Sequence, residues 1–182
     1  MTTTMHSLTR WDSTPPIDMP DDDFIARLHD LVERAAPALL RLADDDVTQR
    51  PSPNRWSPKE TLGHLIDSAA NNHQRFVRAQ EQDDLVFPGY EQDAWVQTQR
   101  YREADWPSLV TLWWMYNTHL VRVMDAVPAA VRFREYERHN LDEIAWQPFP
   151  AGVPATLDDL MRDYGAHLRH HLGQILPADA LS

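Results

Sequence analysis

The chain has 182 residues with no cysteine, 17 basic and 28 acidic side chains, and a formal net charge of -11. The lack of cysteine excludes disulfides, thiolate metal ligands and a cysteine nucleophile. The negative charge opposes a nucleic-acid partner, because binding a phosphate backbone requires clustered Lys and Arg. We therefore expect no nucleic-acid partner.

We expect one domain over residues 1–182, because no Gly/Ser-rich or charged linker divides the sequence. No apolar run approaches the roughly 20 residues that a spanning helix needs, so no membrane partner is expected. Residues 1–20 are polar and lack the basic start and apolar core of a secretory signal. They are predicted to form an N-terminal arm, and the protein is predicted to be cytoplasmic.

The first helix is predicted over residues 22–43, where acidic residues precede apolar residues at helical spacing. Pro37 lies inside this pattern, so we expect a kink or an earlier end. The second helix has a stronger start signal, with Ser57 as N-cap, Pro58 at the first position and Glu60 completing a capping box. It is predicted to continue to about residue 79.

Residues 80–106 have the weakest pattern, and a short extra helix over residues 92–101 is compatible with it. Pro107 begins a third long helix, which Pro128 ends. The irregular residues that follow are compatible with short extended pieces near residues 132–136.

Thr156 is predicted to cap a fourth helix, with Asp159 at its third position, that continues to Pro177. Helices one, two, three and four are long and amphipathic. The sequence therefore predicts an all-α protein, an antiparallel four-helix bundle with long connections.

Three of the nine histidines, His167, His170 and His171, lie in the predicted fourth helix. His167 and His171 are one turn apart beside the apolar stripe, with Cβ atoms about 5 to 6 Å apart, which suits two imidazoles on one metal ion. His170 points toward the outer face. Hydrogen-bonded core histidines are the alternative interpretation of the pair.

The predicted second helix carries His64 in a polar stripe with Ser68, Asn71 and Arg75. A solvent-facing stripe is one interpretation, but Asn71 and the adjacent Asn72 are poor helix formers and favour a polar pocket. Facing helices can build a metal site in a bundle interior. Glycines flank the histidines, and we expect them to allow close approach of the second and fourth helices. These are Gly63, Gly165 and Gly173.

Three segments of the sequence resemble the DinB-like superfamily, and the resemblance covers nearly the whole chain. They are RWSPKE leading to GHLID (residues 55–67), PGYEQDAW (residues 88–95) and, after Tyr164, HLRHHLGQI (residues 167–175). The family includes bacillithiol and mycothiol S-transferases, and the resemblance implies a bundle of four antiparallel helices.

In family members that bind metal, the ligands are one histidine of the helix-two motif and a pair in the last helix. The resemblance therefore implies His64, His167 and His171 as the metal ligands here. Some relatives carry a further histidine where this chain has Gln174, so we expect no additional ligand there. Zinc, nickel, iron and manganese all suit histidine ligands, and zinc or nickel is favoured.

Three imidazoles leave at least one coordination position open, as catalytic sites do. The resemblance favours a metal-dependent S-transferase, in which the cation activates an exogenous low-molecular-weight thiol for attack on an electrophilic small molecule. A metal-dependent hydrolase and a stress-associated binding protein stabilised by its metal are the alternatives. Abundant Trp and Tyr permit a homodimer without requiring one.

For several other polar and aromatic residues two interpretations are open, a role in the site and an ordinary role at the surface or in packing. The candidate general bases are His73 and His119. The candidate pocket donors are Asn71, Asn72, Tyr116 and Asn117, and the candidate carboxylate-binding residues are Arg75 and Arg78. Trp56, Trp95, Trp113, Trp114 and Trp146 are assigned mainly to packing, with Trp56 as a hydrophobic staple before the second helix.

Overall fold

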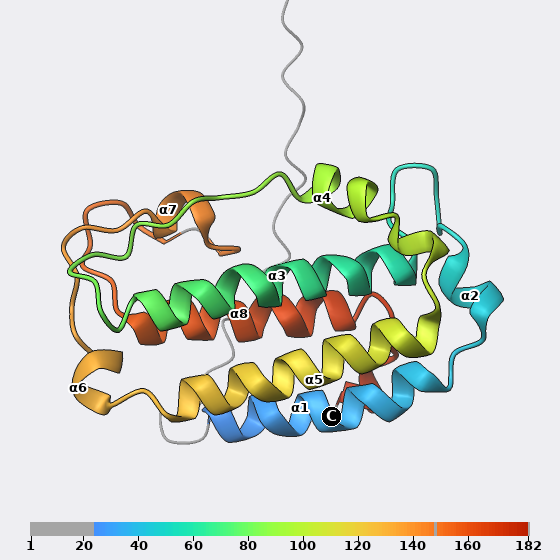
Figure 1. Cartoon of the computed structure of the whole chain (residues 1–182), viewed down its shortest axis with the longest axis horizontal. Coiled ribbons are helices and arrows are strands. Elements are labelled where there is room, and N and C mark those ends of the chain that lie inside the picture. Colours follow the sequence, from blue (N-terminus) through green and yellow to red (C-terminus); the bar gives the residue numbers. More distant parts are fainter. Residues whose placement is uncertain (1–23, 148, 182) are drawn as a thin grey trace, which may run out of the picture.

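The computed structural model describes residues 24–147 and 149–181, and the arm predicted for residues 1–20 lies outside them. The described residues form helices and no strand. The long helices are α1 (Phe24–Leu40), α3 (Pro58–Arg78), α5 (Trp106–Asp125) and α8 (Leu157–Leu172), and they pack as a bundle (Figure 1). The predicted all-α class and four-helix bundle are therefore confirmed.

Each long helix packs against two others: α5 contacts α1 and α3, and α8 contacts the same two helices. α1 and α8 run in one direction along the bundle, and α3 and α5 run in the other (Figure 1). The neighbours α3 and α5 are parallel and not antiparallel as expected, because the chain between them returns along the length of the bundle. Residues 79–105 make this return and are called the crossover below. None of the described helices is both long and apolar enough to span a bilayer.

The predicted capping signals form caps in the structure. Ser57 Oγ accepts a hydrogen bond from the Glu60 backbone N–H at 3.3 Å, and the Glu60 carboxylate accepts one from the Ser57 N–H at 2.9 Å. Thr156 and Asp159 form the same reciprocal pair before α8. Local sequence thus determines where α3 and α8, the helices of His64, His167 and His171, begin.

The ends of the long helices differ from the predicted ends by a few residues. α1 continues through Pro37 but ends at Leu40, earlier than residue 43. α8 ends at Leu172, before the predicted end at Pro177. The extended pieces expected near residues 132–136 reduce to one isolated pairing between Tyr136 and Ala155.

Several short elements connect the long helices. The short helix expected over residues 92–101 is present as α4 (Gln92–Gln99), which is followed by the 3-10 turn η1 (Tyr101–Glu103). The others were not predicted, because one or two turns carry too little periodicity to recognise. They are α2 (Asp44–Thr48), α6 (Ala129–Arg132), α7 (Leu141–Ile144) and the 3-10 turn η2 (Ala178–Leu181).

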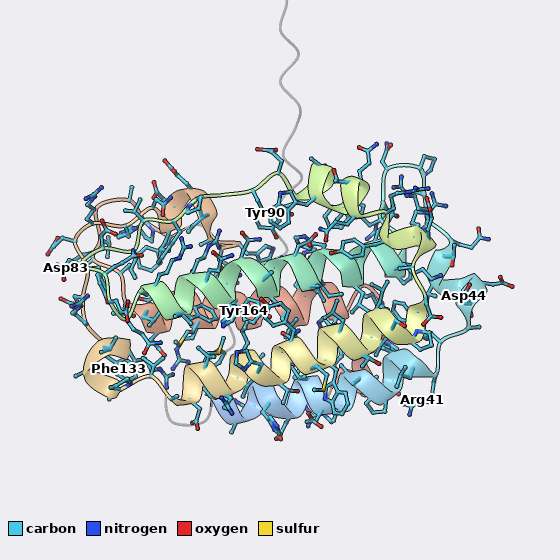
Figure 2. All side chains as sticks on the ribbon, in the orientation of Figure 1. Arg41, Asp44, Asp83, Tyr90, Phe133 and Tyr164 are labelled. Carbon is cyan, nitrogen blue, oxygen red and sulfur yellow. The ribbon has the colours of Figure 1, made fainter. Side chains whose placement is uncertain are left out.

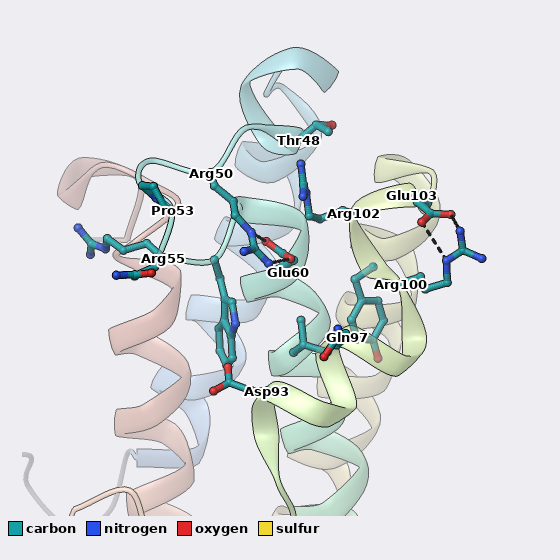
Figure 3. A pocket seen from close by; sticks show the side chains of 14 residues that line it. Thr48, Arg50, Pro53, Arg55, Glu60, Asp93, Gln97, Arg100, Arg102 and Glu103 are labelled. Carbon is teal, nitrogen blue, oxygen red and sulfur yellow. Dashed lines mark hydrogen bonds and ion pairs between the residues drawn. The ribbon is translucent and has the colours of Figure 1, made fainter.

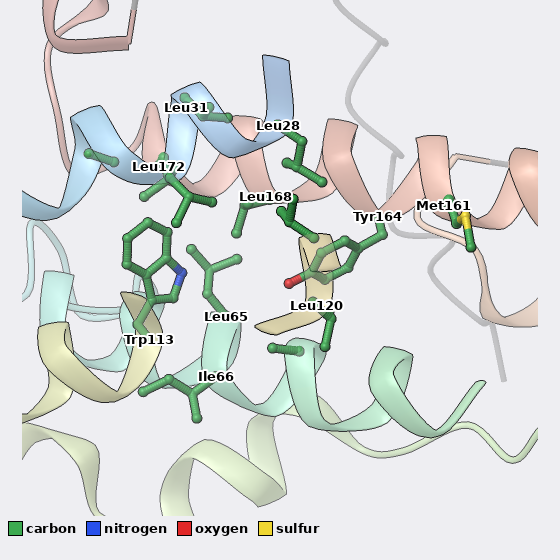
Figure 4. Packing of buried hydrophobic residues seen from close by; sticks show 14 of the residues in the cluster. Leu28, Leu31, Leu65, Ile66, Trp113, Leu120, Met161, Tyr164, Leu168 and Leu172 are labelled. Carbon is green, nitrogen blue, oxygen red and sulfur yellow. The ribbon is translucent and has the colours of Figure 1, made fainter. Parts of the chain in front are cut away.

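The core lies between the four long helices, where Trp113 and Tyr164 pack among leucines (Figure 4). Figure 2 shows Tyr164 inside the bundle and Tyr90 on the crossover, on the far side of α3. The packing assignment is correct for Trp113, which is fully buried, whereas Trp95 packs on Tyr90 at 4.9 Å between ring centroids and stays 40% exposed.

The expectation that glycines bring α3 and α8 together is wrong. Gly63 is in close contact with Tyr101 of η1, and Gly165 is in close contact with Phe24 of α1. A β-carbon at Gly173 would come no closer than 3.4 Å to any neighbour. Gly63 therefore allows close packing of the crossover on α3, and Gly165 allows close packing of α1 on α8.

Candidate metal centre

His64 of α3 and His167 and His171 of α8 converge where the two helices pack together. Each offers a ring nitrogen, and these nitrogens all lie within 4.8 Å of one another. The Nε2 atoms of His64 and His167 are 3.0 Å apart. The ring centroid of His171 lies 4.9 Å from that of His64 and 4.5 Å from that of His167. This spacing is close enough for three imidazoles to share one ion.

Burial keeps these three imidazoles neutral. His64 is 0% exposed and His167 7% exposed, while His171 is partly exposed. Burial and the neighbouring His171 lower the pKa of His64 to about 3. Burial lowers the pKa of His171 to about 4, against the opposing effect of its hydrogen bond with Gln174. The pKa of His167 also lies well below its usual value, because of burial and the nearby imidazoles. Each ring therefore keeps a lone pair at neutral pH.

Side chains outside the triad orient two of its rings. His171 Nδ1 lies 3.0 Å from Gln174 Oε1, so this nitrogen carries the proton and Nε2 is left as the acceptor. His167 Nδ1 lies 3.4 Å from the hydroxyl oxygen of Ser68. Such partners fix the tautomer and direction of metal-binding histidines.

The arrangement of the nitrogens fits a cation. His64 Nδ1 is buried without a hydrogen-bond partner among the described residues. A proton on His64 Nδ1 and one on His167 Nδ1 would leave two Nε2 lone pairs facing each other at 3.0 Å. Without an ion this contact requires one ring to adopt the other tautomer, whereas a cation between the two rings would satisfy both lone pairs.

Two tryptophans border the triad. The Trp56 ring lies 4.9 Å from the His64 ring, and the Trp146 ring lies 6.1 Å from that of His167. Trp146 also packs on the exposed His170, at 5.0 Å between ring centroids. His170 therefore lies beside the triad without being part of it, as its position on the helix predicts.

The candidate general bases lie elsewhere. His73 follows His64 by two and a half turns of α3, about 13 Å along the helix axis. Its ring contacts are with His119, at 5.0 Å between centroids, and with Tyr116, whose hydroxyl lies 3.3 Å from His73 Nδ1. These three residues form a separate group across α3 and α5.

The other predicted polar residues form hydrogen bonds within α3, with the crossover or between α5 and α8, and none is part of the triad. Arg75 is buried and donates to the Pro88 carbonyl of the crossover at 3.2 Å. Asn72 donates to the Ser68 carbonyl at 3.0 Å. Asn117 accepts a hydrogen bond from the buried Tyr164 hydroxyl. Asn71 donates to the Asp67 carbonyl, and Arg78 donates to Gln74.

Sequence reasoning missed a buried carboxyl one turn from His64. Asp67 is 3% exposed, and its Oδ1 accepts hydrogen bonds from the Tyr101 hydroxyl at 2.7 Å and from Gln99 at 2.6 Å. Burial raises its pKa despite these bonds. Asp67 ends the GHLID motif, but both of its partners come from the crossover, where the sequence pattern is weakest.

The fold and the converging histidines define a helical-bundle protein with a candidate metal centre. The model of the DinB superfamily matches residues 27–175, so the chain belongs to this family. Its structure is similar to that of YfiT from Bacillus subtilis, described as a probable metal-dependent hydrolase with an unusual four-helix bundle topology. The TM-score is 0.70, with 17% sequence identity over 88% of each chain. No curated protein matches the sequence significantly.

Proposed function

We propose that this protein is a metal-dependent enzyme with His64, His167 and His171 as ligands. The convergence of three neutral, mostly buried imidazoles carries the proposal. The structural similarity of the chain to YfiT, which is described as a probable metal-dependent hydrolase, supports metal dependence. An all-nitrogen ligand set suits zinc, nickel, iron and manganese, with zinc or nickel favoured.

A bound ion would supply Lewis acidity at the position that three histidines leave open. The residues of the chain would hold and orient it. Ser68 and Gln174 fix two of the rings, while Trp56 covers His64. Of the three ligands, His171 is the partly exposed one.

For the reaction we favour transfer of a low-molecular-weight thiol to an electrophilic small molecule. The family resemblance supports this reaction, and the thiol must be exogenous because the chain has no cysteine. Hydrolysis is the second candidate, and the description of YfiT favours it. Both reactions would use the same open position, with sulfur or oxygen as the attacking atom.

The first experiment measures metal content by elemental analysis of untagged protein. Wild type should carry close to one equivalent, and His64→Ala and His167→Ala should each remove most of it. His170→Ala is the matched control, because His170 lies on the same helix outside the triad. Wild-type protein that stays metal-free after incubation with zinc, nickel, iron and manganese would overturn the proposal.

The second experiment distinguishes the reactions. Metal-loaded protein is given an electrophilic dye with and without added thiol, and separately a panel of ester and amide substrates without thiol. Turnover that requires the thiol supports the transferase, and thiol-independent ester or amide cleavage supports the hydrolase. Full metal occupancy with a large loss of melting temperature on metal removal, and no turnover in either assay, would instead indicate a structural metal.

A further inference from the structure

A hollow of about 830 Å³ lies beside the candidate metal centre, between the segment that joins α2 to α3 and the α4–η1 segment of the crossover (Figure 3). Its volume lies within the usual range for small-molecule sites. Trp56 lines the hollow, and its ring is also in contact with His64. The hollow and the metal centre therefore share a wall.

Arginines line this hollow, although the chain as a whole is strongly acidic. Arg50 is paired with Glu60, and Arg100 is paired with Glu103 at 2.6 Å. The other two, Arg55 and Arg102, form no ion pair within the described part of the chain. The hollow thus offers two cationic groups that form no ion pair with any carboxylate of residues 24–147 and 149–181.

The Glu60 carboxylate is not available to form an ion pair with Arg102. Its carboxylate already accepts hydrogen bonds from Arg50 and from the backbone N–H of Ser57. Burial raises the pKa of Glu60, but these bonds outweigh the effect and hold the pKa below its usual value. Glu60 is therefore ionised and fully engaged.

The charged side chains of the lining point in different directions. Arg102 extends toward the Arg50–Glu60 pair, whereas Arg100 and Glu103 point away from the hollow (Figure 3). The remaining carboxylate of the lining is Asp93. An anionic group in the hollow is therefore attracted to Arg102.

We infer that this hollow binds a carboxylate-bearing small molecule, with its carboxylate on Arg102 and its apolar part on Trp56, the ring that covers His64. A guanidinium pairs with a carboxylate through two parallel hydrogen bonds. Asp93 disfavours a dianionic phosphate, so we assign a carboxylate. That this molecule is the substrate rests on the proposed function, whereas its binding does not require the metal.

The test uses metal-free, full-length protein and two probes of similar shape, 4-phenylbutyrate and the neutral 4-phenylbutan-1-ol. Binding is followed by the NMR signal of the Trp56 indole N–H, which is assigned by its absence in Trp56→Phe. The acid should shift this signal and the alcohol should not. Because no metal is present, failure of this test and failure of the metal-content test are distinguishable.

Two arginine variants test the position of the carboxylate, with Arg100→Gln as the control for Arg102→Gln. Arg102→Gln should weaken binding of the acid by about tenfold, since it removes a charge-assisted hydrogen bond. Arg100→Gln should change it less than about twofold, because its partner is Glu103. Equal binding of acid and alcohol, equal effects of the two variants, or no shift of the Trp56 signal would each overturn the inference.

Discussion

The aromatic ring of Tyr101 lies against the backbone of Gly63, the residue before His64. A β-carbon built at Gly63 would lie 2.1 Å from Cδ2 of that ring. The Tyr101 hydroxyl also donates a hydrogen bond to Asp67, one turn further along α3, at 2.7 Å. Tyr101 is therefore held at both ends of its ring, and it attaches the crossover to the turn of α3 that carries His64.

Gly63→Ala should destabilise the protein by about 1–3 kcal/mol, because the added methyl group requires the Tyr101 ring to move. A thermal melt against Gly89→Ala provides the measurement and its control, since a β-carbon at Gly89 would have no neighbour closer than 3.9 Å. In a Tyr101→Ala background the Gly63→Ala penalty should largely disappear. An equal penalty with and without the tyrosine side chain would contradict the contact as its cause.

The long helices could be predicted because their signals are local. Ser57 and Glu60, and likewise Thr156 and Asp159, lie within one turn of each other, so the sequence contains the whole capping interaction. Elements such as α6 and α7 are too short to carry a periodic pattern. They depend on tertiary contacts that local sequence does not contain.

The candidate site, like the fold, could be predicted only where its signals are local in the sequence. The spacing of His167 and His171 on one helix and the polar stripe of His64 both indicate a site, and the family resemblance implies all three as ligands. The partner of Gly63 could not be predicted, since Tyr101 comes from the crossover and reaches α3 only in the folded chain. Gln174 was interpreted as the absence of a ligand, whereas the structure gives it a hydrogen bond to His171 Nδ1.

Gln174→Ala should weaken metal binding by about tenfold, because it removes the acceptor that orients His171. Competition with a chromophoric chelator measures the affinity. Gln174→Glu keeps an acceptor oxygen and should retain most of the affinity. If the alanine variant bound metal as tightly as wild type, Gln174 would have no part in holding the ligand.

Asp158→Asn should lower stability by about 2–4 kcal/mol without changing metal content. The Asp158 carboxylate is 6% exposed and accepts hydrogen bonds from Arg132 and from Arg162, each at 2.6 Å. It lies in the first turn of α8, at the opposite end of the helix from His171. Urea unfolding and elemental analysis of one preparation test both parts, and a loss of metal at full folding would contradict the second.

The metal-free protein should lose stability as the pH falls below about 6.5. In the folded state the pKa of His64 is about 3 and that of His171 about 4. Both return to about 6.5 on unfolding, so the unfolded chain binds more protons within this interval. Lowering the pH therefore favours the unfolded state, and the stabilising effect of two neutral imidazoles is lost progressively toward pH 4.

A variant is needed to isolate the contribution of the histidines to acid sensitivity, because two buried carboxyls stabilise the folded state as the pH falls. Burial raises the pKa of Asp67 and of Asp163, so protonation of these groups stabilises the folded state as the pH falls. Urea unfolding in a chelator at several pH values compares wild type with His64→Gln/His171→Gln. The variant should lose less stability between pH 7 and pH 5, since glutamine does not titrate. Parallel losses in the two proteins would mean that the triad does not govern the acid sensitivity of the fold.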